Sequence, residues 1–359
     1  MKCPSIFRIM PNRVWRTYLG GRTLDGLGGA EAPADTHFPE DWILSTTLAR
    51  NIGREEFATE GLSQLAAGEG GVSFLTDWLE RCPLEMLGER HLKRFGKSAG
   101  FLLKYLDSSI RLHLQCHPTV AFSRSHLNSD NGKSEGYVIL GHRPGIEPYI
   151  YLGFQHPLEK SAFRKAVLEQ DGTAILSCFE KIPVRPGDVF FVPGGLPHAI
   201  GEGIFMVEIM EPTDFAVRIE FNRGGYVLPE QARFMGRGVD FALSMFDFRE
   251  RSVEEIRRKL FVTPRRLALA GSGERFSLCD SRYTDCFRAE RMSVCGTAEV
   301  GHDSFRVFIV TEGEGTVSAG TETLPLKPFD RVPIPFHAGT VRLESRNGMS
   351  ILTALPPEP

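Results

Sequence analysis

Two short segments of the chain, about eighty residues apart, carry side chains that could bind one divalent metal ion. Gln115 and His117 are followed by Lys133 and Glu135, and the second segment ends at His198. Side chains two residues apart on a β-strand leave the same face, so Gln115 and His117 are expected to point together, as are Lys133 and Glu135. An amide oxygen, two imidazoles and a carboxylate suit Zn²⁺, although ligand type alone leaves Mn²⁺, Fe²⁺ and Ni²⁺ open.

Each of these residues has a simpler explanation when it is considered alone. A lone His117 is more often a hydrogen-bonded core histidine, Gln115 a cross-strand amide and Glu135 a surface carboxylate. The spacing G-x5-P-x-G-x2-H, from Gly187 to His198, changes this balance because it resembles the second signature of cupin barrels. Taken together, the residues predict one metal site. Five other histidines lack a comparable setting and are expected to be structural or surface residues: His113, His126, His142, His156 and His302.

The segments around these residues predict a mainly β protein with helical insertions. Short runs rich in branched and aromatic residues, separated by Gly, Pro, Asn and Asp, favour antiparallel strands in a sandwich or barrel. The runs span 101–106, 110–116, 137–140, 149–154, 174–178, 188–192, 204–209 and 216–221. Helical periodicity is expected at about 54–95, where Ser73 could cap a helix, and at 229–259, where Ser252 and Glu255 have capping-box spacing.

The C-terminal part of the chain looks like a degenerate copy of the first strand-rich region. When 187–193 is aligned with 329–335, Thr340 takes the place of His198, and His337 is three residues out of register. The sequence therefore predicts two cupin (jelly-roll-like) β-barrels joined by a helical connector. The expected divisions are an N-terminal barrel with the metal site and the 54–95 helical insertion at 1–228, the connector at 229–259, and a C-terminal barrel without a metal site at 260–359.

Several motifs together resemble the type I mannose-6-phosphate isomerases, also called phosphomannose isomerases. The similarity runs from about residue 14 to 225 and continues more weakly to the end of the chain. It rests on a Q-x-H-P segment at 115–118, a G-K-[ST]-E segment at 132–135, H-A-I-G-x-G at 198–203, Glu208-Ile209, and P-[ST]-D-x-x-x-R at 212–218. The resemblance implies that Gln115, His117, Glu135 and His198 are zinc ligands, with one Zn²⁺ per chain. It places Lys133, Glu208 and Arg218 at active-site positions.

The family reaction interconverts an aldose phosphate and a ketose phosphate by moving a proton between C1 and C2 through a cis-enediol. A divalent cation can hold and polarise the reacting oxygens, and a side chain must carry the proton. Glu208 is the conventional candidate, and Arg218 would stabilise negative charge. The sequence leaves open that Arg218 or a water molecule at the metal moves the proton. Without the motif, Glu208 and Arg218 could equally form a strand-edge ion pair.

The residues that would face the substrate depart from the family pattern. His113 stands where the family usually has Ser, a hydroxyl close to the phosphate-binding end, and 220–223 replaces the usual Y-D-W-G-R. The identity of the sugar is therefore open, as is the need for phosphate, although Lys133, Arg218 and Arg223 could hold a phosphate dianion. The favoured function is interconversion of mannose 6-phosphate and fructose 6-phosphate. The alternatives are isomerisation of another sugar, a non-catalytic carbohydrate-binding cupin, and a cupin oxygenase, against which Gln115 counts.

Composition excludes several other classes of protein. The chain has 359 residues, 42% hydrophobic and 24% charged, with a formal net charge of −3. Nothing indicates a surface for nucleic acid or anionic lipid, and no apolar run approaches the roughly 20 residues that span a bilayer. The seven cysteines are scattered and odd in number, which favours reduced thiols in a cytoplasmic protein. The expected partner is a small sugar phosphate, and the oligomeric state stays open.

Overall fold

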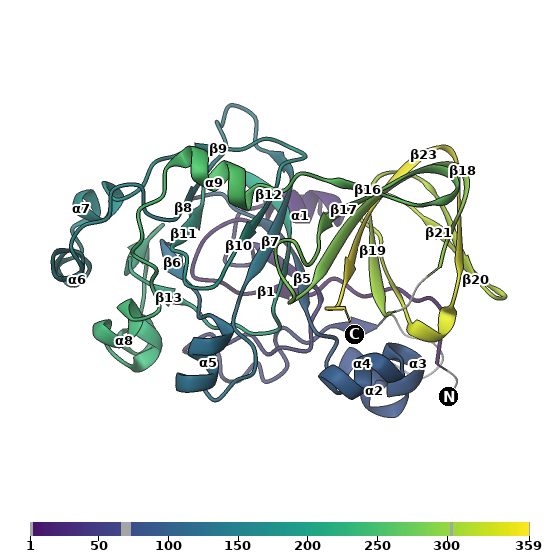
Figure 1. Cartoon of the computed structure of the whole chain (residues 1–359), viewed down its shortest axis with the longest axis horizontal. Helices are drawn as coiled ribbons and strands as arrows, with labels where there is room; N and C mark the ends of the chain where they lie inside the picture. Colours follow the sequence, from purple (N-terminus) through teal and green to yellow (C-terminus); the bar gives the residue numbers. More distant parts are fainter. Residues whose placement is uncertain (1–2, 66–72, 302–303, 359) are drawn as a thin grey trace.

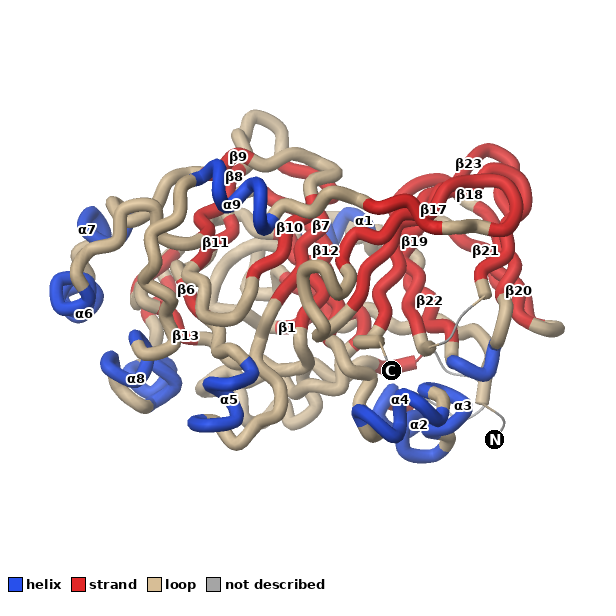
Figure 2. Tube along the Cα trace, viewed as in Figure 1, coloured by secondary structure: helices blue, strands red, loops and turns tan. Residues whose placement is uncertain are grey.

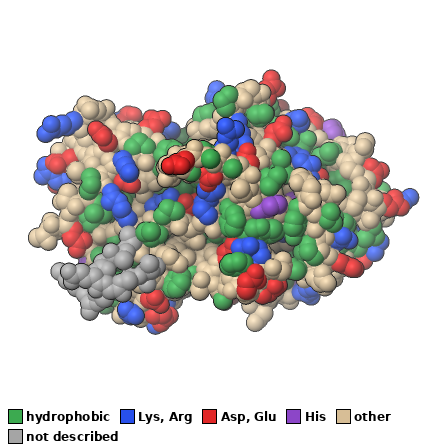
Figure 3. Space-filling model, turned by 180° about the vertical axis from the view of Figure 1, so that it is seen from behind, with side chains coloured by type: hydrophobic (Ala, Val, Ile, Leu, Met, Phe, Trp, Pro, Cys, Tyr) green, Lys and Arg blue, Asp and Glu red, His purple; other side chains and the backbone are tan. Residues whose placement is uncertain are grey.

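The computed structural model describes residues 3–65, 73–301 and 304–358. Strands dominate it (Figure 2), as the sequence predicts. Figure 1 shows two lobes side by side, one built from the N-terminal two thirds of the chain and the other from the green-to-yellow C-terminal part. Acidic and basic side chains are interspersed over the face drawn in Figure 3. The described residues include no helix with the length and apolar character that a membrane span requires.

The N-terminal lobe contains two antiparallel sheets. The first has the order β1-β2-β5-β12-β7-β10, with β1 Arg13–Val14, β2 Glu40–Leu44, β5 Leu102–Asp107, β12 Ile204–Met210, β7 Glu135–His142 and β10 Val189–Val192. The second has the order β13-β6-β11-β8-β9, with β13 Val217–Arg218, β6 Gln115–Cys116, β11 His198–Ile200, β8 Tyr149–Leu152 and β9 Ile182–Pro183. Apolar side chains of both sheets, including those of Met206 and Leu152, share one core cluster.

Alternation along β5 and β12 gives the first sheet two different faces. Leu103 and Val207 belong to a core cluster that also contains Phe305 and Leu352 of the C-terminal lobe. The side chains between them in sequence, which include Lys104 and Glu208, must point to the opposite face because the strand period is two. Both strands are buried along their whole length. The same two strands therefore join the lobes on one face and carry charged groups into the N-terminal lobe on the other.

The C-terminal lobe is a single eight-stranded sheet. Six strands follow the order β16-β17-β18-β23-β19-β22, and β20 pairs with both β21 and β23. Their bounds are β16 Arg265–Leu267, β17 Ala270–Cys279, β18 Arg288–Val300, β19 Arg306–Gly313, β20 Gly315–Ala319, β21 Glu322–Leu326, β22 Arg331–Ile334 and β23 Val341–Leu355. Across the described residues, no sheet has end strands that pair with each other. None of them closes into a barrel, so the two-barrel prediction is not confirmed.

The expected repeat is visible in one turn. β10 begins two residues after Gly187 and β22 two residues after Phe329, and both of these residues have positive φ, 93° and 68°. Gly187 N donates to Ile139 O at 2.9 Å, and Phe329 N donates to Val310 O at 2.8 Å. Ile139 N and Val310 N each donate back, at 3.0 Å, to the residue after the positive-φ position. The alignment of 187–193 with 329–335 is thus reproduced in the backbone.

Short helices lie at the periphery of both lobes (Figure 1). Within the described residues they are α1 Arg22–Leu27, α2 Leu75–Arg81, α3 Pro83–Leu87, α4 Glu89–Phe95, α5 Val120–His126, α6 Lys160–Glu169, α7 Gly172–Leu176, η1 Glu230–Gly236, α8 Val239–Leu243, α9 Val253–Leu260 and η2 Phe336–Ala338. The Ser252 hydroxyl caps α9 by accepting from Glu255 N at 3.1 Å. The predicted 229–259 segment is therefore helical only in η1, α8 and α9.

Two predicted elements differ from the structure. The expected strand at 174–178 lies largely within α7, because the Asp171 carboxylate accepts from Ala174 N at 3.0 Å and starts a helix there. The helical segment expected at 54–95 begins only at Leu75. Before it lie turns and the short strands β3 Gln64–Leu65 and β4 Ser73–Phe74, while 66–72, with its glycines, is outside the described residues. Ser73 is not the cap of α2, since its hydroxyl accepts from Trp78 Nε1 at 2.9 Å.

Candidate metal centre and active site

Three of the four predicted ligands converge at one point between the two N-terminal sheets. His117, Glu135 and His198 offer ligand atoms that all lie within 4.8 Å of one another. Glu135 Oε1 is 3.2 Å from His117 Nε2, and Glu135 Oε2 is 3.3 Å from His198 Nε2. The amide of the fourth, Gln115, reaches the same point, with Nε2 3.5 Å from His198 Nε2. All three residues of the cluster are buried.

Strand register explains how the second sheet supplies its part of the site. Gln115 in β6 lies directly opposite His198 in β11 on one side and directly opposite Arg218 in β13 on the other. Side chains directly opposite in an antiparallel pair point to the same face, with Cβ atoms about 5 Å apart. One short row across the sheet therefore presents an amide, an imidazole and a guanidinium together. Glu135 comes from the other sheet, at the start of β7.

Outer hydrogen bonds fix both imidazoles with Nε2 facing the centre. His117 Nδ1 donates to Phe215 O at 2.7 Å, and His198 Nδ1 donates to Leu196 O at 2.9 Å. A carbonyl oxygen can only accept, so the proton is on Nδ1 and the lone pair is on Nε2 in both rings. Burial lowers the pKa of His117 to about 3, which keeps its ring neutral. Neutral imidazoles oriented in this way by backbone carbonyls are the usual form of metal ligands.

A positively charged side chain, that of Lys133, also lies at this centre. Lys133 Nζ lies 2.7 Å from Glu135 Oε1 and 3.0 Å from His117 Nε2, so an ammonium stands among the converging atoms. Burial disfavours the Glu135 carboxylate, but favourable interactions that include the charge of Lys133 outweigh it and hold its pKa well below the usual range. Two nitrogen lone pairs, a buried carboxylate and an amide therefore fit a divalent cation such as Zn²⁺.

Two glycines let the backbone around His117 pack closely. A Cβ added at Gly132 or Gly194 would come within 2.6 Å of Pro118 O. Lys133 N donates to the same carbonyl at 3.0 Å, and Gly195 N donates to His117 O at 2.7 Å. The segment after β6 is thus clamped between the loop that carries Lys133 and the loop before His198. Glycine at 132 and 194 makes this close packing possible, because neither residue has a Cβ.

The first sheet contributes a chain of buried charges beside the metal centre. Lys104 Nζ lies 3.1 Å from Glu208 Oε2 and 3.3 Å from Glu40 Oε2, and Arg16 Nε lies 2.9 Å from the same Glu40 oxygen. Tyr18 Oη donates to the other Glu40 oxygen at 2.6 Å. Glu208 Oε1 has no partner in the described part of the chain. Burial raises the pKa of Glu208 to about 8, although Lys104 opposes the rise.

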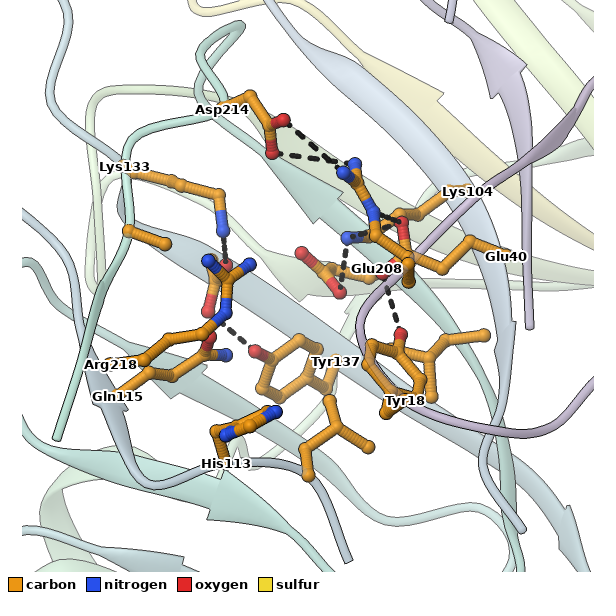
Figure 4. A pocket seen from close by; sticks show the side chains of 15 residues that line it. Tyr18, Glu40, Lys104, His113, Gln115, Lys133, Tyr137, Glu208, Asp214 and Arg218 are labelled. Carbon is orange, nitrogen blue, oxygen red and sulfur yellow. Dashed lines mark hydrogen bonds and ion pairs between the residues drawn. The ribbon is translucent and has the colours of Figure 1, made fainter. Parts of the chain in front are cut away.

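Arg218 is a cation of this site whose guanidinium has no partner among the described residues. No hydrogen bond or ion pair to its guanidinium is found within the described ranges, and burial lowers its pKa. In Figure 4 the side chain lies between Lys133 and Tyr137, beside Gln115. Arg218 and Asp214 both line an inner cavity of about 30 Å³ and an adjoining outer cavity of about 330 Å³. An unpaired guanidinium where two cavities meet is available for an anionic group of a ligand.

The structure brings the predicted site residues together. Five of them line the inner cavity: Gln115, Lys133, Glu135, Glu208 and Arg218. The two predicted histidine ligands adjoin it through Glu135. Arg223, expected as a possible phosphate ligand, lines neither cavity and donates to Arg111 O at 3.1 Å. The prediction missed six polar residues of the inner wall: Arg16, Tyr18, Glu40, Lys104, Tyr137 and Asp214. A charged residue inside an apolar strand run, such as Lys104, is the signal that could have indicated them.

His113, expected to be a structural or surface residue and to stand at a substrate-facing position, is buried. It forms part of the inner cavity wall. Its ring is buried, with Nδ1 donating to Glu220 O at 2.9 Å and Nε2 without a partner in the described structure. Burial, together with Arg218, lowers its pKa to about 4. His302, which shared that prediction, lies outside the described residues.

Known proteins resemble the chain both in sequence and in fold. A mannose-6-phosphate isomerase of Streptococcus mutans is 27% identical over 278 residues, covering 76% of this chain and 81% of that protein. A mannose-6-phosphate isomerase of Bacillus subtilis is 25% identical over 289 residues, covering 78% and 84%. The crystal structure of a Bacillus subtilis mannose 6-phosphate isomerase superposes with a TM-score of 0.73 at 18% identity, covering 98% of this chain and 99% of that one. No family model matches the chain.

These likenesses indicate what the chain is similar to. Over nearly its whole length the fold is that of the phosphomannose isomerases. The sequence similarity to mannose-6-phosphate isomerases covers about three quarters of the chain, and His117, Glu135 and His198 of the motifs described above meet at one site.

Proposed function

We propose that this protein is a metal-dependent aldose–ketose isomerase that interconverts mannose 6-phosphate and fructose 6-phosphate through a cis-enediol. One observation carries the proposal. Glu135 of the His117–Glu135–His198 cluster, the unpaired guanidinium of Arg218 and the raised-pKa carboxyl of Glu208 border a single cavity. A metal site, an anion-binding group and a base with a pKa near neutrality are what a sugar-phosphate isomerase needs within reach of one substrate.

The proposed metal is one Zn²⁺ per chain, held by Gln115, His117, Glu135 and His198. Mannose 6-phosphate isomerase structures that resemble this fold are described as zinc bound. The ion, when bound, supplies the charge that polarises the substrate oxygens at C1 and C2. The His117 and His198 rings are held in the required tautomer by backbone carbonyls, as described above.

The remaining residues bind the sugar and move its proton. Glu208 removes the proton from one carbon and returns it to the other, and its raised pKa makes both steps accessible near neutral pH. Lys104 positions the Glu208 carboxylate through Oε2, which leaves Oε1 for the substrate. Arg218 binds the phosphate through its free guanidinium. Lys133 contributes positive charge beside Glu135.

The domain organisation belongs to the same proposal. The N-terminal lobe, 1–228, would be a cupin unit that holds the metal, 229–259 would be the connector, and 260–359 would be a cupin unit without a metal site. The reproduced turn at Gly187 and Phe329 supports common descent of the two lobes. A cytoplasmic location is a further part of the proposal, and the free state of all seven cysteines agrees with it.

Two measurements test the function. Elemental analysis of the purified protein should find about one equivalent of zinc per chain. Exchange of the C2 proton with solvent should then be assayed on a panel of phosphorylated and free aldoses, with mannose 6-phosphate expected to give the fastest exchange. Exchange on another sugar alone would assign a different substrate. Metal-replete protein that exchanges no proton on any sugar would overturn the isomerase proposal and favour a carbohydrate-binding protein.

A further inference from the structure

His113 is a buried acceptor that the proposed mechanism does not use. Its imidazole forms part of the wall of the inner cavity, opposite the charges of the first sheet, and only 1% of the residue is exposed. Within the described structure Nε2 has no hydrogen-bond partner. Buried polar atoms of native proteins nearly always have a partner, so an orphan on the wall of a ligand cavity points to a group of the ligand.

The ring of His113 is held in one orientation and one tautomer. Nδ1 lies 2.9 Å from Glu220 O, a carbonyl that can only accept, so Nδ1 carries the proton. The Glu220 residue is itself fixed, because its carboxylate accepts from Arg111 at 2.8 and 2.6 Å and from Leu114 N at 2.6 Å. In this tautomer the lone pair of the ring is on Nε2, which has no partner among the described residues.

A fixed lone pair selects the chemistry of the group that it meets. It can accept a hydrogen bond from a hydroxyl, and it repels the oxygens of a phosphate or carboxylate. The phosphate is accordingly better placed on the Arg218 side, where an unpaired guanidinium meets the outer cavity.

We propose that His113 determines sugar specificity by accepting a hydrogen bond, at Nε2, from one hydroxyl group of the bound sugar phosphate. This inference rests on the proposed isomerase function and deepens it. The hydroxyl is one of those at C3, C4 or C5, because C1 and C2 are taken up by the reaction and C6 carries the phosphate. The site then rejects sugars that lack this hydroxyl, since they leave Nε2 buried without a donor.

The test pairs single-hydroxyl analogues with variants of His113. Mannose 6-phosphate and its 3-, 4- and 5-deoxy analogues are compared by kcat/KM for C2 proton exchange in the zinc-replete protein. For the wild type, loss of the contacting hydroxyl should lower kcat/KM by about 10- to 100-fold. In His113→Leu the ratio of kcat/KM for mannose 6-phosphate to kcat/KM for that deoxy analogue should fall to within about threefold of one, because the acceptor is gone. His113→Gln, whose amide oxygen can reach the position of Nε2, should restore part of it. Ratios in His113→Leu that equal those of the wild type for all three analogues would overturn the proposal.

Two controls separate this proposal from folding and from the proposed function. Thermal melting and zinc content establish that the variants are folded, and His113→Asn, whose amide is too short to reach, replaces the Leu variant if that one does not fold. Mannitol 6-phosphate and its deoxy forms cannot isomerise, so calorimetry measures their Kd values. The corresponding ratios of Kd report the same hydroxyl contact without catalysis. Ratios that depend on His113 without proton exchange would overturn the isomerase function alone. Exchange without this dependence would overturn the role of His113 alone, and neither exchange nor binding would overturn both.

Discussion

Lys104 and Glu208 face each other directly across β5 and β12, with Nζ 3.1 Å from Oε2. Both side chains are buried, and the ion pair occupies the face of the sheet that lines the inner cavity. The pairing is one-sided, because the second oxygen of Glu208 is left without a partner in the described structure. Burial raises the pKa of Glu208 to about 8 while Lys104 pulls it down. The charge of Lys104 therefore lowers the pH at which the Glu208 carboxyl loses its proton and can act as a base.

The first prediction concerns the pH dependence of catalysis. Glu208 acts as a base only when ionised, so kcat/KM should rise with pH as this group loses its proton. Lys104→Met removes the cation that favours the ionised form, so the rising limb should move to higher pH by about 1 to 3 units. The measurement is kcat/KM against pH for both proteins at saturating zinc. A limb that stays in place or moves to lower pH would show that Lys104 does not control this carboxyl.

The second prediction isolates proton transfer from metal binding. Glu208→Gln keeps the shape of the side chain but removes the base, and kcat should fall by about 100- to 10,000-fold. Zinc content should stay near one equivalent, because Glu208 is not among the converging ligand atoms. Turnover close to the wild-type value with metal still bound would assign the proton transfer to another group, such as Arg218.

Local patterns in the sequence indicated which side chains converge at the candidate metal centre, because much of this geometry is local. Gln115 and His117 are two residues apart, and the spacing before His198 specifies a turn. The role of Lys104 could not be predicted in this way, since it depends on its register with Glu208, about a hundred residues away. The same applies to His113, whose tautomer is set by a distant carbonyl.

The prediction of secondary structure was wrong where a short apolar run fitted the strand period and the helix period equally well. The run at 174–178 has strand-like composition, but a side-chain cap at Asp171 starts a helix there. By contrast, the two segments that the sequence aligns, 187–193 and 329–335, form the same backbone turn, although Phe329 replaces Gly187 at the positive-φ position. In this chain, alignment of the two related segments therefore indicates local backbone structure better than residue composition does.

The third prediction concerns the metal ligands. His117→Ala should reduce bound zinc from about one equivalent to a small fraction, because it removes one of the converging ligand atoms. The matched control is His337→Ala in the C-terminal lobe, where His337 Nε2 lies 3.5 Å from Ser5 Oγ and Nδ1 lies 3.2 Å from Glu85 O. Its zinc content should equal that of the wild type. Elemental analysis after dialysis decides the question, and loss of metal in the control would place a ligand in the second lobe.

The fourth prediction concerns the close packing around Pro118. In Gly194→Ala the new Cβ would meet Pro118 O at 2.6 Å, a backbone atom that cannot move without displacing His117. We expect a loss of about 1 to 3 kcal/mol in unfolding free energy and weaker zinc binding. Gly141→Ala in β7 is the control, since no atom lies within 4 Å of its added Cβ. Equal stability and equal zinc affinity of the two variants, measured by denaturant unfolding and metal competition, would contradict the proposed clamp.

The last prediction concerns the buried pair of Arg111 and Glu220, which holds the carbonyl that orients His113. Burial opposes ionisation of Glu220, but hydrogen bonds from Arg111 outweigh it and lower its pKa, so the pair contributes stability above pH about 4.3 that is lost as the pH falls further. Arg111→Met leaves the carboxylate buried without its cation, at a cost of about 3 to 5 kcal/mol at pH 7.5. The pKa of Glu220 should then be raised, so the carboxyl takes up a proton on acidification and the cost should shrink toward pH 5.

Denaturant unfolding at several pH values measures this cost. Arg185→Met is the matched control, because the Arg185 side chain is 86% exposed in a longer pair, 3.5 Å from Asp188, and its loss should leave stability unchanged at every pH. A cost for Arg111→Met that stays constant between pH 7.5 and pH 5 would mean that Glu220 remains ionised without its partner. In that case another group must compensate the buried charge, and the orientation of His113 would not depend on Arg111.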